Sequence, residues 1–326
     1  MTRVALARTA TVALVAGCAL AAFGAPSAHA QDFVGTRAMS LSEAYRASAT
    51  GNDAIYFNPA GLVVIQRYAL ELNYQLNLQK EEHTVDLSVV DSKTSPMAAG
   101  LAYTFDGREF TKRYSLQHKA TLALAYPVLD KLLSVGAGLK YVNVTDAVLG
   151  NYLNALSADL GILSRLPFGV SIGAVGYNLI PIQSQRAPLS AGFGLNLDFG
   201  PLSALVFGGS PVLGAKANAA GLPSTSSMGD VQGPLAGLTL EGDVNLDFTT
   251  LYGTQSRWSA GLEYLAFDTI PLRAGYLWDQ ATNDQQVSVG AGFIVPYFGL
   301  DVGYRQSVLH LGTHVFAIGL KFFLPV

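Results

Sequence analysis

The sequence has 326 residues but only one cysteine, Cys18. That cysteine lies in an N-terminal segment that we expect to be removed, so the mature chain would hold no thiol. Disulfides, thiol catalysis and cysteine-based metal sites are then excluded.

Charged residues are also scarce. They make up 13% of the chain, against about 25% in an ordinary soluble domain. The mean hydropathy is +0.32, and the formal net charge is only −3. We infer that membrane lipid, rather than water, solvates part of the surface, and we expect no nucleic-acid partner.

The first thirty residues have the pattern of a secretory signal peptide. Arg3 and Arg8 precede an apolar run, and residues 28–30, Ala-His-Ala, have the form of a cleavage site. Cys18 and the three residues before it also resemble a lipobox, in which Cys18 would become a lipidated N-terminus. The longer apolar core favours cleavage after Ala30. The pattern predicts export beyond the bacterial inner membrane.

After residue 30 the dominant pattern is alternation of apolar and polar residues. In the stretch RYALELNYQLNLQK, residues 67–80, apolar side chains take the even positions from 68 to 78, and polar ones take the odd positions from 67 to 79 except Ala69. The alternation lasts about twelve residues, longer than the five or six of a usual soluble strand. Transmembrane strands need about 9 to 11 residues with this alternation. Prolines interrupt the long uncharged runs, which argues against membrane helices.

Counting such segments predicts an all-β fold, a transmembrane antiparallel β-barrel of about 14 strands. The expected strands are 67–80, 83–91, 95–106, 113–127, 131–146, 153–164, 168–178, 187–198, 235–248, 255–267, 270–279, 284–296, 297–306 and 312–323. With an even number of antiparallel strands, the first strand begins and the last strand ends on the same side of the membrane. Residues 200–230 are too long for a periplasmic turn; they hold two short strands or mark a shifted register.

A soluble β-sandwich or β-helix would also alternate. It would not need aromatic residues on the apolar face near strand ends, as an interfacial girdle does. The residues in such positions are Tyr68, Tyr126, Trp258, Trp278 and Phe322. This placement favours the membrane barrel.

Glycines recur within the expected strands. Three G-x-G pairs, at 136/138, 192/194 and 290/292, lack the third glycine and following helix of a nucleotide loop. The alternation puts them on the inward face, together with Gly100, Gly173, Gly261, Gly275, Gly303 and Gly319; Gly242 is an exception. Either they curve the barrel wall, or an internal segment lies against it. The natural candidate for such a segment is 31–66.

The same inward face carries charges of both signs. They are Glu71, Lys140, Asp159, Glu241, Asp243, Asp247, Arg257, Glu263, Arg273, Asp301, Arg305 and Lys321. Mixed signs inside a barrel favour a structural network over a selective charged pore, so we predict no ion-specific channel.

An enzyme would need a nucleophile, a base and an orienting group within reach of one another. The few histidines after residue 30 belong to no recognisable nucleophile or metal motif, and the His310-x-x-x-His314 spacing lacks an adjacent glutamate. We therefore expect no enzyme activity, no catalytic residue, no metal and no cofactor.

The N-terminal segment 31–66 reads as a short helical hatch. Ser40-x-x-Glu43 has the form of a capping box and predicts a helix over residues 41–49. Asn58 precedes a proline and must be extended, and the following Ala-Gly predicts a turn before the first strand. We therefore expect the chain to have three parts: a signal peptide at 1–30, the hatch at 31–66 and a barrel at 67–326.

The stretches GTRAM and AYRASATGNDAIYFNPAGL in this segment resemble the N-terminal signature of FadL/TodX-type outer-membrane proteins and their shorter PorV/PorQ-like relatives. LSVGAGLKYV and WSAGLEYLAFDTIPLRAGYLW are similar to the shorter relatives. The resemblance implies a fourteen-stranded barrel with a hatch in its lumen, to which Asn58, Pro59, Ala60 and Gly61 belong. Ser42 and Glu43 stand where relatives often have glycines.

The resemblance also implies two functions. FadL-type proteins move hydrophobic compounds, such as fatty acids or aromatic hydrocarbons, across the bacterial outer membrane, and Ile55, Tyr56 and Phe57 would be candidate ligand contacts. The alternative for these three residues is packing of the hatch against the wall. PorV-like relatives instead work with protein secretion machinery, so the expected partners are outer-membrane lipid and either a hydrophobic small molecule or a secretion-system protein.

Overall fold

The computed structural model describes residues 33–110, 113–129, 132–146, 150–180, 188–200, 237–248, 253–309 and 313–324. The predicted signal peptide, Cys18, His310 and the segment 200–230 lie wholly or almost wholly outside these residues. Among the described residues, no helix is both long and apolar enough to cross a membrane.

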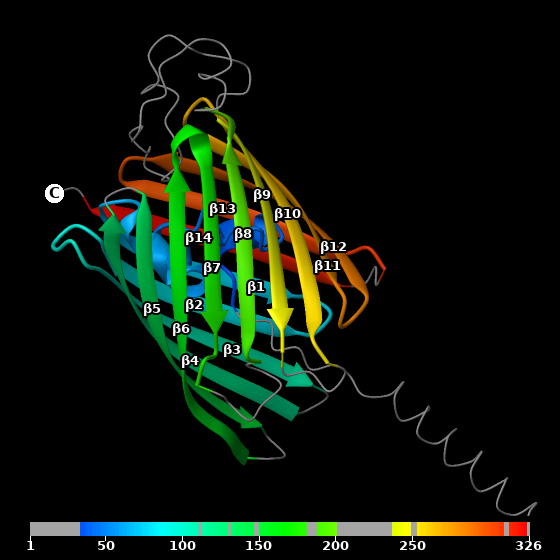
Figure 1. The fold of residues 1–326 in the computed structure, drawn as a ribbon. Coiled ribbons are helices and arrows are strands. Elements are labelled where there is room, and N and C mark those ends of the chain that lie inside the picture. Colours follow the sequence, from blue (N-terminus) through cyan, green and yellow to red (C-terminus); the bar gives the residue numbers. More distant parts are fainter. Residues whose placement is uncertain are drawn as a thin grey trace, which may run out of the picture. The chain divides into compact units, whose positions relative to one another are not determined.

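The described strands form one closed antiparallel barrel, in which each strand pairs with its neighbours in sequence and β1 closes onto β14 (Figure 1). The strands are β1 Tyr68–Asn77, β2 Glu82–Asp91, β3 Ala98–Phe110, β4 Arg113–Leu129, β5 Leu133–Asp146, β6 Gly150–Leu166, β7 Val170–Tyr177, β8 Ser190–Asp198, β9 Leu238–Asp247, β10 Gln255–Ala266, β11 Ile270–Asp279, β12 Asp284–Val295, β13 Phe298–Ser307 and β14 His314–Leu324. The predicted fold class is confirmed. Predicted strand ends lie within about four residues of the observed ones, the precision expected of boundaries inferred from a sequence.

Short helical turns precede and interrupt this barrel. They are α2 Thr36–Ser40, η1 Gly51–Asp53, α3 Ala54–Phe57 and η2 Pro59–Val63 before β1, and η3 Pro167–Gly169 between β6 and β7. We call residues 33–66 the hatch. We call the end of the barrel at which β1 begins and β14 finishes the terminal end, because Tyr68 and Leu324 are paired there.

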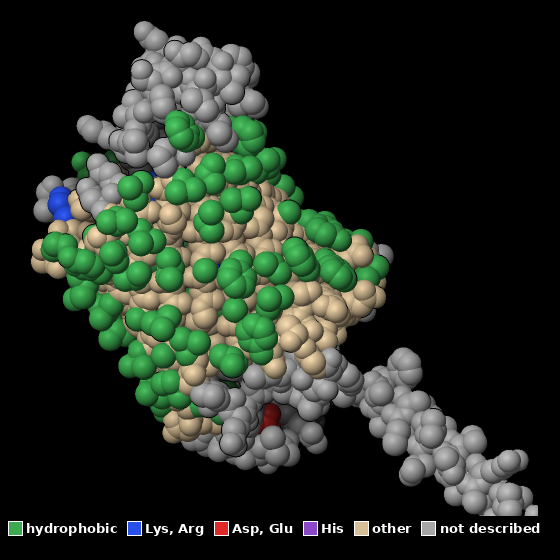
Figure 2. All heavy atoms as spheres, viewed as in Figure 1, with side chains coloured by type: hydrophobic (Ala, Val, Ile, Leu, Met, Phe, Trp, Pro, Cys, Tyr) green, Lys and Arg blue, Asp and Glu red, His purple; other side chains and the backbone are tan. Residues whose placement is uncertain are grey.

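The alternation in sequence becomes an inside and an outside in the barrel. Along β1, Glu71 and Asn73 are buried, whereas Leu70 and Leu72 are exposed. Similar exposed leucines, valines and aromatics occur on the other strands, and Figure 2 shows hydrophobic side chains spread over the visible wall. Such an apolar outer surface fits lipid rather than water.

Placing a charge on this outer surface tests the membrane assignment. We expect Leu72→Arg, in the middle of β1, to destabilise the barrel in lipid vesicles by about 2 to 4 kcal/mol. Leu78→Arg, just beyond the end of β1, is the matched control and is expected to cost about 0 to 1 kcal/mol. Urea unfolding in vesicles measures both. Equal costs at the two positions would contradict a lipid-facing belt.

Three histidines lie on this outer surface, and each bonds to a tyrosine across a hairpin. The pairs are Tyr74–His83 at 2.7 Å, Tyr103–His118 at 2.6 Å and Tyr304–His314 at 2.7 Å. They join β1 to β2, β3 to β4 and β13 to β14, which are neighbouring hairpins of the barrel. Amphipathic ring pairs of this kind are typical of a membrane interface.

The helix predicted over residues 41–49 is wrong. The observed helix is α2, and it ends at Ser40, one residue before the predicted helix was to begin. Ser42 and Glu43 have φ angles of 53° and 69°, which are incompatible with a right-handed helix. The Ser40 hydroxyl donates back to the Thr36 carbonyl, and the Glu43 carboxylate pairs with the barrel wall, so no capping box forms.

Candidate functional site

The hatch lies inside the barrel, as the blue segment in Figure 1 shows. Most of its side chains are buried, including large ones such as Met39, Leu41, Tyr45 and Ile55, each at most 1% exposed. Because a side chain in the lumen can be buried only by the wall or by the hatch itself, these residues and the inward face of the barrel form one core.

The Asn-Pro-Ala motif joins three parts of this core. Asn58 is fully buried and extended, with φ −158° and ψ 100°, as a residue before proline must be. Its Oδ1 accepts a bond from the Ala60 N–H at 3.2 Å. Its Nδ2 donates to the Arg46 carbonyl at 3.0 Å and to the Ile162 carbonyl of β6 at 3.1 Å. One amide thus fixes the turn, a distant part of the hatch and the wall.

Wall glycines let the motif approach this closely. A Cβ added at Gly136 would lie 2.3 Å from the Ala60 nitrogen, and one at Gly161 would lie 2.2 Å from Asn58 Oδ1. An added Cβ would also lie within 3 Å of a hatch atom at seven other wall glycines: Gly100, Gly173, Gly192, Gly194, Gly275, Gly290 and Gly303. The prediction that an internal segment lies against inward glycines is confirmed. At Gly242 an added Cβ meets nothing within 4 Å.

Two of the three predicted ligand contacts, Ile55 and Tyr56, pack against the wall in this structure, and the Phe57 ring packs within the hatch. Ile55 packs against Gly100, and the Tyr56 hydroxyl donates to Asp86 Oδ2 at 2.5 Å. The Phe57 ring lies edge-on to Tyr45 at 5.8 Å. Packing of the hatch against the wall therefore describes the present contacts of Ile55 and Tyr56, while contact of the three residues with a ligand stays a prediction.

A network of ion pairs holds α2 against β10, β11 and β13. Arg37 donates from Nε and Nη2 to the two oxygens of Glu263, at 3.1 and 2.7 Å. Arg273 donates to the same Glu263 at 2.5 Å and to Asp301 at 2.6 Å. All four side chains are nearly inaccessible to solvent. Buried charges of this kind are stable only when each has its partners.

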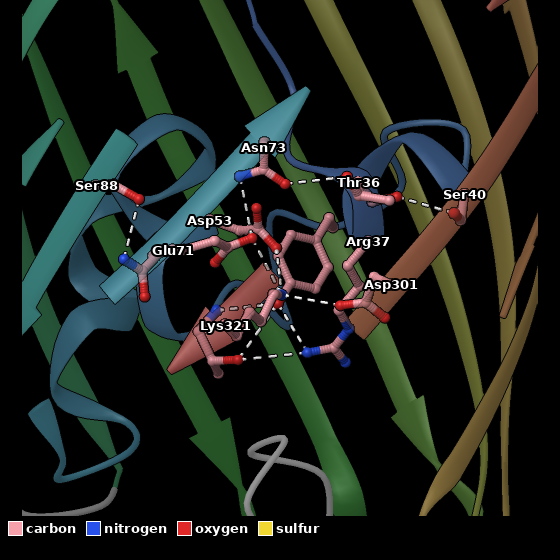
Figure 3. Close-up of polar contacts among 12 residues, drawn as sticks. Thr36, Arg37, Ser40, Asp53, Glu71, Asn73, Ser88, Asp301 and Lys321 are labelled. Atoms are coloured by element: carbon pink, nitrogen blue, oxygen red, sulfur yellow. Dashed lines mark hydrogen bonds and ion pairs between the residues drawn. The ribbon is translucent and has the colours of Figure 1, made fainter. Parts of the chain in front are cut away.

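The network continues to a lysine of β14. Figure 3 shows Lys321 pointing between the carboxylates of Asp53, Glu71 and Asp301, from which its Nζ lies 3.8, 3.4 and 3.2 Å. Nearby, Thr36 donates to Asn73 at 3.0 Å. Hatch and wall are therefore joined here through side chains of both signs.

A second cluster surrounds the turn after α2. The Glu43 carboxylate accepts from Arg305 at 3.0 Å and from Arg257 at 3.2 Å, and Arg257 also pairs with Asp279 at 3.2 Å. Burial raises the pKa of Glu43, but Arg257 and Arg305 lower it by more, so the pKa lies below its ordinary value. This pairing explains why Glu43 keeps a left-handed backbone conformation where glycine would be easier.

A third cluster binds the next turn of the hatch. Asp243 Oδ2 accepts bonds from the backbone N–H groups of Tyr45 and Arg46, at 3.0 and 2.9 Å, and from Arg46 Nη1 at 3.0 Å. Arg46 also donates to the Tyr177 hydroxyl at 2.9 Å. Asp243 thereby supplies both a charge and the hydrogen-bond acceptor that the turn lacks.

The predicted lumen charges are thus brought together, and their partners are largely hatch residues. Lys140 and Asp159 pair within the wall at 2.9 Å, and Glu241 accepts a bond from Ser48 of the hatch. These pairs are what a structural network requires, and the interpretation of the lumen charges as such a network, rather than a selective pore, stays a prediction. Sequence reasoning missed the hatch members Arg37, Glu43, Arg46 and Asp53. The signal was available: charges within a segment expected to be buried need opposite charges on the surrounding wall.

Within the part of the chain that the structure describes, no three His, Cys, Asp or Glu side chains are placed to hold a metal ion. The predictions of no metal, no cofactor and no catalytic residue stay predictions. The polar clusters instead join two parts of one chain.

Comparisons with known proteins add the fold relationship. No protein-family model and no curated protein matches the chain. Solved structures do match. A structure described as the CymD monoaromatic hydrocarbon channel has a TM-score of 0.63 at 14% identity, covering 92% of this chain and 100% of that one. The fold is shared.

Two further structures extend this finding. The toluene transporter TbuX of Ralstonia pickettii has a TM-score of 0.59 at 14% identity, covering 88% of this chain and 98% of its own. The toluene transporter TodX of Pseudomonas putida has a TM-score of 0.57 at 12% identity, covering 91% and 99%. The resemblance to FadL/TodX-type proteins is thus supported at the level of the fold, and these neighbours are named as a channel and transporters. The closeness to PorV/PorQ-like relatives finds no support here.

Proposed function

We propose that this chain is a bacterial outer-membrane barrel that mediates passive transport of hydrophobic compounds, of the fatty-acid or aromatic-hydrocarbon kind. The fold shared with structures named as a monoaromatic hydrocarbon channel and toluene transporters supports this proposal. The apolar outer surface supports the membrane location. Residues 1–30 would be the export signal, 31–66 the hatch and 67–326 the barrel.

One observation carries the proposal: the hatch is held by side chains and not by the sheet. Among the described residues, the backbone–backbone hydrogen bonds of residues 33–64 stay within that segment. The contacts to the wall are ion pairs, hydrogen bonds that involve a side chain, and packing against the wall glycines. A hatch bound in this way can move without breaking the strand pairing that closes the barrel, as a plug in a transport channel must.

A reversible lock tests this function. The hydroxyls of Ser42, in the hatch, and Ser288, in β12, lie 2.6 Å apart, close enough for a disulfide after modest adjustment. We expect the oxidised Ser42→Cys/Ser288→Cys double variant to lose uptake of a labelled fatty acid or alkylbenzene into liposomes. Reduction should restore uptake, because the same protein then frees its hatch.

Each single-cysteine variant, treated with the same oxidant, is the matched control and should transport normally. Uptake by the oxidised double variant at the rate of the reduced one would contradict hatch movement. If neither the natural protein nor the reduced variant moves any apolar solute, the transport function itself fails.

A further inference from the structure

A large pocket opens at the terminal end of the barrel, beside the foot of the hatch. Its volume is about 810 Å³, within the range of small-molecule sites. Three parts of the chain line it: residues 63–66 of the hatch, residues 92–96 between β2 and β3, and the adjoining ends of β4, β5 and β6. The hatch therefore forms one wall of the pocket.

The lining of this pocket combines apolar side chains with positive charge. Its apolar part includes Val63, Ile65, Leu129, Leu132, Leu133 and Leu163. Leu129 and Leu132 keep 55% and 38% of their surface exposed. Among the described residues of the lining, Lys93 and Arg165 are cationic and none is acidic. A neutral hydrocarbon would need only the apolar residues of the lining and not the two cations.

A smaller gap of about 50 Å³ shares Val64, Leu163 and Arg165 with the pocket. It extends under the hatch to Arg37 and Glu241, which belong to the polar interface described above. Asp198 lies in this gap and acts electrostatically on Arg165. Arg165 therefore stands at the boundary between the apolar pocket and the polar underside of the hatch.

We propose that this pocket binds an amphipathic carboxylate, with its apolar chain or ring against Val63, Ile65 and the leucines and its carboxylate at Lys93 and Arg165. Charge complementarity and pocket size support this occupant. Burying apolar surface favours the tail, and charge-assisted hydrogen bonds favour an anionic head over a neutral one. In transport, this site would hold the acid at the terminal end of the barrel; that role rests on the proposed function.

Equilibrium binding tests the site without measuring transport. The full chain in lipid nanodiscs is dialysed against decanoate or decanol, and binding to empty nanodiscs is subtracted. We expect decanoate to bind more tightly than decanol. A decanoate that carries a photoreactive group at its chain end should cross-link to residues 63–66 and to the ends of β4 and β5, as mapped by mass spectrometry.

Two variants separate the charge from the cavity. Lys93→Gln/Arg165→Gln is expected to weaken decanoate binding by about tenfold and to leave decanol binding unchanged. Val64→Trp fills the cavity and should weaken both. The matched control is Lys80→Gln, which removes a cation between β1 and β2 at the opposite end, and it should change neither.

Equal binding of decanoate and decanol, or an unchanged decanoate affinity in Lys93→Gln/Arg165→Gln, would overturn the proposal, as would cross-links confined to other regions. If Val64→Trp does not fold, Lys93→Gln/Arg165→Gln still tests the proposal. Lys93 and Arg165 are exposed, so we expect their replacement to leave the fold intact. If decanoate binds but liposome uptake is absent, the proposed binding site stands and the transport function is refuted. If uptake occurs but decanoate does not bind, the transport function stands and the binding site is refuted.

Discussion

Replacing Gly136 with valine is expected to displace the hatch from the barrel wall. A Cβ at this position would lie 2.3 Å from the Ala60 nitrogen and 2.4 Å from the Pro59 carbonyl carbon. These are backbone atoms, so no side-chain rotation can relieve the contact, and we expect a cost of about 3 kcal/mol, at the upper end for overpacking. Urea unfolding in lipid vesicles measures this cost.

Proteolysis separates displacement of the hatch from general unfolding. In Gly136→Val, cleavage within residues 33–66 should rise while the barrel stays protected. The matched control is Gly242→Val, since nothing lies within 4 Å of a Cβ added there. It should leave both stability and cleavage unchanged. Equal behaviour of the two variants would mean that the hatch does not depend on close packing against the wall.

The second large effect is expected from Arg273→Met. Arg273 is fully buried and pairs with Glu263 and Asp301, so its loss leaves two buried carboxylates short of a partner. Breaking a buried pair from one side costs about 3 to 5 kcal/mol. We expect the lower end, about 3 kcal/mol, because Arg37 still contacts Glu263 and Lys321 still contacts Asp301.

The fluorescence of the two tryptophans reports this unfolding, since Trp258 and Trp278 are cross-strand partners on β10 and β11, the strands of Glu263 and Arg273. Arg108→Met is the matched control. Its pair with Glu82 is partly open to solvent at 31% and 25% exposure, and we expect a change below about 1 kcal/mol. A similar small change in Arg273→Met would show that the buried network does not stabilise the barrel.

The barrel could be predicted from the sequence because the pattern that identifies each strand lies within that strand. Alternation along one strand, as in β1, identifies both faces of that strand without knowledge of its partners. The same alternation put Gly136, Gly192 and Gly290 on the inward face and left Gly242 outside. Strand ends were less well defined, because alternation fades gradually where a strand leaves the membrane.

The hatch was predicted only in part. Asn58 before Pro59 had to be extended for local steric reasons, and it is. The helix over 41–49 failed because the capping-box residues had stronger partners elsewhere: Glu43 bonds to Arg257 and Arg305, more than two hundred residues away in the sequence. Local propensity cannot anticipate partners at that separation.

The sequence by itself therefore determined the strands, their inward and outward faces, and the need for something inside the barrel to meet its glycines and charges. Only the tertiary structure decided which hatch residue meets which part of the wall. Arg37 with Glu263, Arg46 with Asp243 and Asn58 with Ile162 are contacts between chain positions that no periodicity relates. Closure of the barrel brings these residues together, and the cost of burying an unpaired charge or amide then selects the pairs.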